Sequence, residues 1–261
     1  MHSREIVDET LRLKALGMTD HAIAAQCSVS VQALRHWRYG TRRAPHTTAD
    51  RSFYCPVCAN GDVDPAAYSY LLGLYLGDGY IGHIRNGVDY LSIACSDTWP
   101  GLIEECAEAI PKVFPVKVFR VRRKGCTEVK GASKHWRCVF PQNGRGMKHS
   151  RPIVLDPWQQ QIVDDHTPSF VRGLIHSDGC RVSNRVRKKT GEGWKYYEYP
   201  RYFFSNTSQE ISDLLTNGLD RLGIAWKRRV EEKPPHHDAF IVSVAQKAAV
   251  ARMDEFVGPK Y

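Results

Sequence analysis

The sequence predicts an α+β fold in which two similar halves, each with the element order αββαββα, follow a small all-α module. Three observations support this prediction. An apolar helix closed by glycine occurs in residues 70–80 (YLLGLYLGDGY) and again in residues 170–180 (FVRGLIHSDGC). Each copy is followed by segments of alternating polar and apolar residues, which are typical of strands, and by amphipathic helices. Residues 4–40, in contrast, show only the periodicity of helices.

The composition restricts the class of protein. The chain has 261 residues and a formal net charge of +9, which favours a polyanionic partner. No apolar run approaches the roughly 18 residues that a membrane-spanning helix needs, and residues 1–5 lack the apolar segment of a secretory signal. The eight cysteines are scattered, unlike those of a secreted disulfide framework. We therefore expect a cytoplasmic protein with reduced thiols and no membrane partner.

Residues 1–42 are predicted to form three short helices. Thr19 and Ser30 are placed to cap the second and third helices, and Leu34 and Trp37 face inward from the third. The pattern resembles the helix-turn-helix of bacterial regulators and transposases, in which the third helix enters the major groove of DNA. The alternative is a small interaction module with a solvated basic face. The outward residues of the third helix, which are the candidate DNA contacts, are Gln32, Arg35, His36 and Arg38.

Residues 43–65 are polar, show no period and are predicted to form a linker. They contain Cys55-Pro-Val-Cys58, a spacing found in zinc sites. A closed zinc site needs four ligands, but no second CxxC and no HxxxH follows, and His46 is the nearest further candidate. We therefore expect two free thiols in a tight turn rather than bound Zn²⁺.

Residues 66–165 form the first predicted half. An Asn-Gly pair after the first motif helix is a strong hairpin signal, and Pro100 favours the start of a helix. The expected elements after the motif helix are strands at 80–84 and 90–95, a helix from Pro100, strands around 116–121 and 136–140, and a connecting helix at 158–163.

Residues 166–261 are predicted to repeat this order with one longer hairpin. From the motif aspartate to a repeated serine there are 18 residues in the first half (78 to 96) and 27 in the second (178 to 205). The extra length is assigned to the hairpin. The expected elements are strands at 181–186 and 196–204, a helix at 211–222, strands at 224–230 and 240–244, and a closing helix at 245–256.

Two such sheets side by side would form a concave saddle. Basic residues on its strands are candidate contacts to a polyanion. Because successive side chains of a strand point to opposite faces, only about half of them are expected to face the groove. The candidates are Arg120, Arg122, Arg181, Arg185, Lys227 and Arg229.

The two motif helices are predicted to pack on each other and to bring two carboxylates together. Small residues four apart, such as Gly73 and Gly77, lie on one helix face and allow a close approach of backbones. Asp78 and Asp178 then stand at helix C-termini, where the macrodipole disfavours negative charge, and they would repel each other. A divalent metal is the simplest group that would offset this cost.

The duplicated helix resembles the LAGLIDADG motif of homing endonucleases, over about residues 66–261. In that family the motif helices of two αββαββα halves form the central interface, and their last acidic residues bind the catalytic metals over DNA. The resemblance implies that Asp78 and Asp178 bind Mg²⁺ and are catalytic. The earlier acidic position of the motif is Leu76 in one copy and His176 in the other, a departure expected to affect packing more than chemistry.

The family usually adds a basic residue near the attacking water. Lys148 in the first half and Lys247 in the second are the candidates, although each could instead contact phosphate or be a solvated charge.

Two functions remain in view. The resemblance implies a monomeric endonuclease with internal pseudo-twofold symmetry that hydrolyses both strands of a specific double-stranded DNA site. The alternative is a DNA-binding transcriptional regulator that joins the same two modules and lacks cleavage. An intein remnant is disfavoured, because residue 1 is neither Cys nor Ser. Two carboxylates facing phosphate would weaken a pure binder, so their presence favours the nuclease. Either protein would be cytoplasmic and associated with a bacterial nucleoid while bound.

Overall fold

The computed structural model describes residues 2–39, 55–58, 61–84, 87–191, 193–235, 237–258 and 260. Contacts within the chain divide it into two units, Met1–Phe53 and Tyr54–Tyr261. Among the described residues, no helix is both long and apolar enough to cross a membrane.

The first unit contains the three predicted helices, α1 (Arg4–Ala15), α2 (Asp20–Gln26) and α3 (Val31–Tyr39). The backbone N–H of Ala22 donates to Thr19 Oγ1 at 3.3 Å, and that of Ala33 donates to Ser30 Oγ at 3.1 Å. Both caps therefore satisfy N–H groups that a helix start leaves without partners. Apolar side chains from all three helices are buried, and they include Val7, Leu13, Ile23, Leu34 and Trp37.

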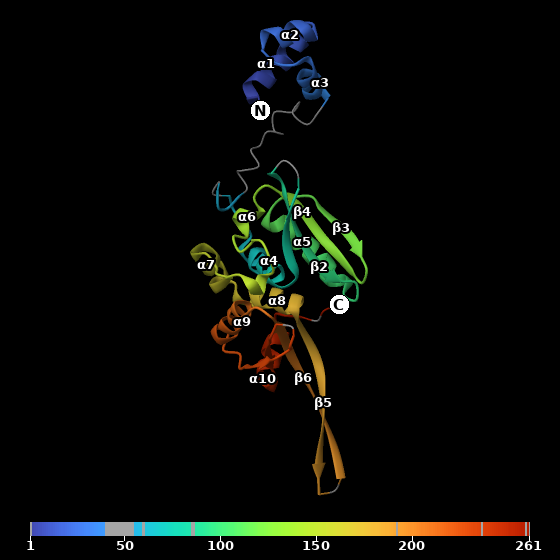
Figure 1. Ribbon diagram of the computed structural model, residues 1–261, viewed down its shortest axis with the longest axis vertical. Coiled ribbons are helices and arrows are strands. Elements are labelled where there is room, and N and C mark those ends of the chain that lie inside the picture. Colours follow the sequence, from blue (N-terminus) through green and yellow to red (C-terminus); the bar gives the residue numbers. More distant parts are fainter. Residues whose placement is uncertain are drawn as a thin grey trace. The chain divides into compact units, whose positions relative to one another are not determined.

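The second unit has the predicted α+β fold, with two αββαββα halves and two antiparallel four-stranded sheets (Figure 1). The strand order is β1-β2-β4-β3 in one sheet and β5-β6-β8-β7 in the other, so the two halves share one topology. In the first half the elements are α4 (Pro65–Asp78), β1 (Gly79–His83), β2 (Asp89–Ser96), α5 (Pro100–Val113), β3 (Val118–Arg123), β4 (Cys126–Ser133) and α6 (Trp136–Val139).

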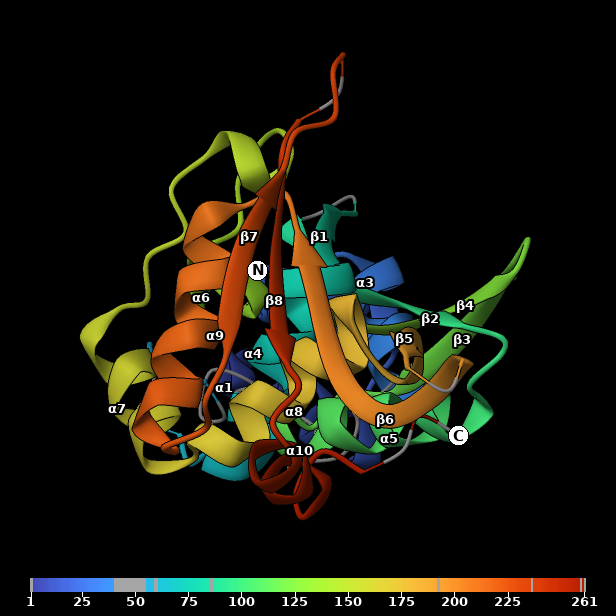
Figure 2. The ribbon, with the colours of Figure 1, turned by 90° about the horizontal axis from the view of Figure 1, so that it is seen from below.

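A short 3-10 helix, η5 (Lys148–Ser150), and α7 (Pro157–Asp165) connect the halves. The second half then repeats the order with α8 (Thr167–Asp178), β5 (Gly179–Thr190), β6 (Gly193–Asn206), α9 (Gln209–Arg221), β7 (Lys227–Glu231), β8 (Ala239–Val244) and α10 (Lys247–Asp254). Figure 2 shows β6, β8 and β7 lying next to one another in this sheet. The extra length predicted for the second hairpin is found in β5 and β6, whose outer part extends beyond α9 and α10 (Figure 1).

The prediction of a strand around residues 136–140 is wrong. Residues 136–139 form the single helical turn α6, and the fourth strand of the first sheet is β4 instead. The buried residues of this segment are Trp136, Val139 and Phe140, which fit the helical spacing i, i+3, i+4. A run this short also fits the alternation of a strand, so its pattern alone could not decide between the two.

The two halves are joined by the packing of α4 against α8. A Cβ atom added to Gly173 would lie 2.2 Å from the carbonyl oxygen of Tyr70, and one added to Gly73 would lie 2.6 Å from that of Phe170. Backbone therefore touches backbone at these positions, which only glycine permits. The rest of α4 is apolar around its circumference and is buried by both halves, as its position at the centre of the unit requires.

Candidate active site

The C-terminal ends of α4 and α8 meet, and each ends in an aspartate, Asp78 or Asp178. A Cβ atom added to Gly77 would lie 2.1 Å from Ser177 Oγ and 2.9 Å from Asp178 Oδ2. The carboxylate of Asp178 therefore lies against the last turn of the opposite helix. The small residues at 77 and 177 make this approach possible, as the sequence predicts.

Two lysines supply positive charge at these helix ends. Lys148 Nζ donates to the carbonyl oxygens of Tyr75, Leu76 and Gly77, at 2.5, 2.9 and 2.7 Å. In the other half, Lys260 Nζ donates to the carbonyl oxygens on either side of the second aspartate, those of residues 177 and 179, at 3.3 and 2.6 Å. Cations are favourable at helix C-termini because the macrodipole is negative there. The lysines thus offset part of the cost of placing two carboxylates at helix C-termini, a cost that a metal ion was expected to offset.

Burial and neighbouring charges shift the pKa of both aspartates and of Lys148. Burial raises the pKa of Asp178 to about 6 and the nearby charge of Asp78 adds to this rise, whereas a 2.6 Å hydrogen bond from Asn206 and the charge of Lys148 lower it. Desolvation of its carboxylate also raises the pKa of Asp78, although the residue as a whole is exposed to solvent, and Lys148 and Lys260 oppose the rise. Burial lowers the pKa of Lys148 to about 8, against the attraction of both aspartates. Each carboxylate therefore lies within the field of the other and of both lysines.

Two hollows in the surface flank Lys148, and each has one aspartate in its wall. The hollow beside Asp178 has a volume of about 310 Å³ and is lined also by His149, Asn206 and Thr207. The hollow beside Asp78 has a volume of about 400 Å³. Each is large enough to hold several water molecules at about 30 Å³ apiece.

The structure brings together three of the four residues predicted to be catalytic. Asp78, Asp178 and Lys148 converge, whereas Lys247 is the exposed first residue of α10 and has no interaction with them among the described contacts. Sequence reasoning missed Lys260 and Asn206. Asn206 directly follows Ser205, the repeated serine of the second half, and its place at the end of β6 directs its amide to Asp178.

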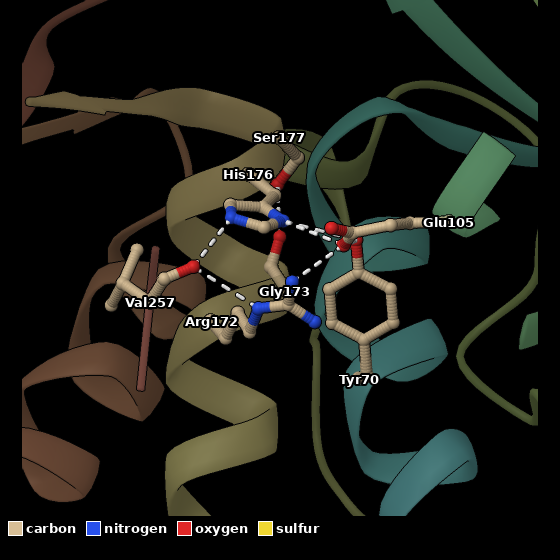
Figure 3. A network of polar contacts seen from close by, with 7 residues as sticks. All are labelled: Tyr70, Glu105, Arg172, Gly173, His176, Ser177 and Val257. Carbon is tan, nitrogen blue, oxygen red and sulfur yellow. Dashed lines mark hydrogen bonds and ion pairs between the residues drawn. The ribbon is translucent and has the colours of Figure 1, made fainter. Parts of the chain in front are cut away.

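His176, at the earlier acidic position of the motif, is buried in a polar network (Figure 3). Its Nδ1 lies 3.0 Å from Tyr70 Oη, and its Nε2 lies 2.9 Å from the carbonyl oxygen of Val257. Because a carbonyl can only accept, Nε2 carries the proton and donates to it. The hydroxyl of Tyr70 has a single proton, and it also contacts Glu105 Oε2, to which it donates at 3.2 Å. Burial lowers the pKa of His176 to about 4, and the charge of Arg172 adds to this effect.

Arg172 extends this network. Its Nε donates to the same carbonyl of Val257 at 3.0 Å, and its Nη2 donates to Glu105 Oε2 at 2.7 Å (Figure 3). These two contacts fix the backbone at Val257, three residues before Lys260, whose ammonium group donates to the carbonyl oxygens beside Asp178.

The predicted basic contacts divide between the two faces of the sheets. Arg120 pairs with Glu104 of α5 at 2.5 Å, and Arg181 pairs with Asp254 of α10 at 2.8 Å, so both lie on the helix-covered faces. Arg122 shares the face of Arg120, because residues two apart in a strand point the same way. Arg185 lies farther out on the hairpin, with its guanidinium 4.4 Å from the centre of the Tyr196 ring.

Lys227 and Arg229 lie on the open face of the second sheet. The residue between them, Arg228, pairs with Asp213 of α9, so its neighbours point away from the helices. On the first sheet the same alternation puts Arg123 and Lys130 on the open face; both pair with Glu128, at 3.0 and 2.9 Å. Lys130 is buried, so Arg123 is the exposed basic residue of this pair, and it differs from the two that the sequence predicted for the first sheet.

In the first unit, Gln32 and Arg35 are exposed on α3 and Arg38 is partly exposed. Asp20 lies 3.6 Å from a guanidinium nitrogen of Arg35 and 3.6 Å from one of Arg38. These are long, partly exposed ion pairs, which leave both arginines available to a more strongly charged partner.

Comparison with known proteins gives matches in structure alone. No family model and no curated protein matches the sequence. Solved structures that resemble the chain include the homing endonuclease I-DmoI in complex with DNA and Mn, with 14% identity, a TM-score of 0.49, and coverage of 76% of this chain and 99% of that one. The LAGLIDADG meganuclease I-AabMI has 10% identity and a TM-score of 0.46, with coverage of 72% of this chain and 83% of that one. The N-terminal LAGLIDADG domain of DUF199/WhiA has 14% identity and a TM-score of 0.45, with coverage of 74% and 83%. The chain is thus similar in structure to LAGLIDADG proteins of more than one kind.

Proposed function

We propose that this chain is a metal-dependent endonuclease that binds a specific double-stranded DNA site as a monomer and hydrolyses both strands. The observation that carries the proposal is the convergence of Asp78 and Asp178 from two pseudo-symmetric halves, with one lysine at each helix end. A duplex has two antiparallel strands, so a twofold arrangement offers one carboxylate to each strand.

The donor set fits Mg²⁺. Carboxylate oxygens are the hard ligands that this ion prefers, and the ion keeps several waters, for which the two hollows provide room. The charge of Asp78 contributes to the raised pKa of Asp178, which also favours a cation between the two carboxylates because a positive charge would relieve their repulsion. When bound, such ions activate a water for attack on phosphorus and stabilise the leaving oxygen.

The chain's own residues hold and orient these groups. The amide of Asn206 fixes one carboxylate at 2.6 Å. Lys148, tied to three carbonyl oxygens, holds a cationic nitrogen between the two hollows, and its lowered pKa of about 8 allows Nζ to exchange a proton near neutral pH. Lys260 places a second ammonium on the other side.

The open faces of the sheets and helix α3 supply the proposed DNA contacts. Lys227 and Arg229 of β7, with Arg201 of β6 two strands away, would contact phosphates. Exposed Gln32 and Arg35 suit the edges of bases in a major groove. The two units would then read separate parts of one site.

A second candidate function is a DNA-binding regulator without cleavage. One observation favours it: the two lysines already counter the negative helix ends, so the carboxylates do not need a metal in order to be tolerated. The candidates therefore differ in chemistry and not in binding.

The experiment begins by selecting duplexes from a random library that the full chain binds in Ca²⁺. Cleavage of the selected duplexes is then measured in Mg²⁺ for the wild type, Asp78→Asn and Asp178→Asn. The expected result is Mg²⁺-dependent cleavage that either substitution reduces by about 100-fold or more, with affinity unchanged or higher because a negative charge facing phosphate is removed.

Asp165→Asn is the matched control, since it removes the same charge from an exposed residue at the end of α7. It should cleave like the wild type. If the wild type binds a duplex tightly and shows no Mg²⁺-dependent cleavage of it, the nuclease is refuted and the regulator takes its place.

A further inference from the structure

Four potential metal ligands come together at the opposite end of α4 from Asp78. They are Cys55, Cys58, His135 and Cys138, and their ligand atoms all lie within 4.8 Å of one another. The nearest pair is Cys58 Sγ and His135 Nδ1, at 3.1 Å. Cys55 and Cys58, expected to be two free thiols in a tight turn, thus have a histidine and a third cysteine beside them. The earlier candidate His46 lies outside the described residues.

The other two ligands, His135 and Cys138, have a spacing different from the two expected for a zinc site. His135 and Cys138 form an HxxC pair in place of a second CxxC or HxxxH. This segment is the one that folds as the helical turn α6 and not as a strand. Residues three apart on a helix lie on one side, whereas in a strand they would point to opposite faces. The change from strand to helix is thus what presents both ligands to the cysteines.

The first pair is also arranged as in a metal-binding turn. Cys55 and Cys58 flank a tight turn in which the N–H of Cys58 donates to Cys55 Sγ at 3.5 Å and the N–H of Gly61 donates to the carbonyl of Cys55 at 3.1 Å. Such an N–H donor stabilises negative charge on sulfur, which a coordinating thiolate carries.

We propose that these four residues bind one structural Zn²⁺ in a closed Cys₃His site. With bonds of about 2.3 Å to sulfur and 2.0–2.1 Å to nitrogen, tetrahedral ligand atoms stand ~3.5–3.8 Å apart, so the observed cluster closes on the ion by small side-chain rotations. Three soft thiolates select zinc over Mg²⁺. All four positions are taken by protein, which makes the ion structural and leaves no place for a reacting water.

The site has a clear mechanical consequence. The zinc site would link two segments: the one that precedes α4, and the turn α6 that follows strand β4. The contact is continued by Tyr68 of α4, whose hydroxyl donates to the carbonyl of Val139 at 2.7 Å, and by His135, whose ring stacks on Phe114 at 5.9 Å. Because α4 has 14 residues and spans about 21 Å at 1.5 Å per residue, the zinc and the aspartates occupy opposite ends of one helix. Zinc would therefore stabilise the fold, and the aspartates would take part in the reaction.

The test measures metal bound to the full chain purified under reducing conditions. We expect one equivalent of zinc per chain in the wild type, and a loss of that equivalent in Cys58→Ser and in Cys138→Ser. Cys126→Ser is the matched control and should keep its zinc, since Cys126 opens β4 outside the cluster. Cys58 is exposed, so its replacement by serine does not disturb the packed core.

Reconstitution keeps the proposal testable if a variant fails to fold. Wild-type chain freed of metal and titrated with Co²⁺ should give the visible spectrum of a tetrahedral thiolate site, saturating at one equivalent, and zinc should displace it. No metal uptake by the wild type, a disulfide between Cys55 and Cys58 in the reduced preparation, or equal zinc content in Cys58→Ser would each overturn the proposal.

Discussion

Replacing Gly173 with alanine should destabilise the second unit by about 2 kcal/mol or more. The new Cβ would lie 2.2 Å from the carbonyl oxygen of Tyr70 and 3.0 Å from Gly73 Cα. Carbon and carbonyl oxygen normally stay at least ~3.3 Å apart, so α4 and α8 would have to separate by about 1 Å where they cross. Overpacking of this kind costs roughly 1–3 kcal/mol, and here both neighbours are backbone, which puts the cost at the upper end. A gap of about that width also forfeits a quarter to a half of the dispersion energy of the contacts it opens. Alanine returns about 1 kcal/mol through its higher helix propensity.

Gly218→Ala is the matched control for this substitution. Gly218 is also helical, but its added Cβ would meet only side-chain methyl groups, Val171 Cγ2 at 2.9 Å and Thr167 Cγ2 at 3.4 Å. Both are side-chain methyl groups that can move without displacing backbone, so the cost should be smaller than for Gly173→Ala even though Val171 Cγ2 must shift by more than half an ångström. Denaturant unfolding of both variants and the wild type, in one buffer and at one temperature, measures the difference. If the Gly173→Ala protein is as stable as the Gly218→Ala protein, the close backbone contact between α4 and α8 is refuted.

Two further predictions concern acid stability and DNA contacts. The folded-state pKa of His176 is lowered to about 4 from an ordinary 6.5, so the unfolded chain takes up a proton first as pH falls and the stability that the neutral ring contributes is lost between about pH 6.5 and 4. From pH 7 to pH 5 the wild type should lose roughly 2 kcal/mol more than His176→Gln, measured by urea unfolding at each pH without added divalent metal; equal losses would show that the ring titrates normally. For DNA, Arg229→Ala should weaken binding and lower the slope of log affinity against log salt by about 0.9, whereas Arg181→Ala, which removes a helix-side ion pair with Asp254, should leave the slope unchanged. An equal effect of both substitutions on the salt dependence would contradict the assignment of faces.

Much of the fold could be predicted because it is repeated in the chain. Each motif helix carries its own signals, a run of apolar residues, small residues four apart and a final Asp-Gly, and these depend only on local periodicity. The caps at Thr19 and Ser30 were also readable, since each is a local side-chain interaction with its own helix. The strand predicted at residues 136–140 failed because a few residues fit both periods, and tertiary packing decided between them.

The residues of the candidate site also fall into two groups, those that the sequence could predict and those that it could not. Asp78 and Asp178 could be named from the sequence, because their positions follow from the ends of two recognisable helices. Lys260 could not be, since its place beside Asp178 depends on the anchoring of Val257 by His176 and Arg172, which lie more than 80 positions earlier in the chain. The face on which a strand residue lies was equally hidden, because it depends on which side the helices cover. One residue of register separates Arg228, which pairs with Asp213 on the helix-covered face, from Arg229, which pairs with Glu231 on the open face.

By itself, then, the sequence determined the duplicated helices, their aspartates and the order of elements, since these follow from period, glycine placement and capping within a few residues. The tertiary structure alone decided which cations meet the carboxylates, which basic side chains reach the open faces, and that a cysteine pair near residue 55 meets a histidine–cysteine pair near residue 135. The physical reason is that these are contacts between segments distant in the chain. The packing of the core sets the geometry of these contacts. The sequence near each residue does not indicate which distant residue it will meet.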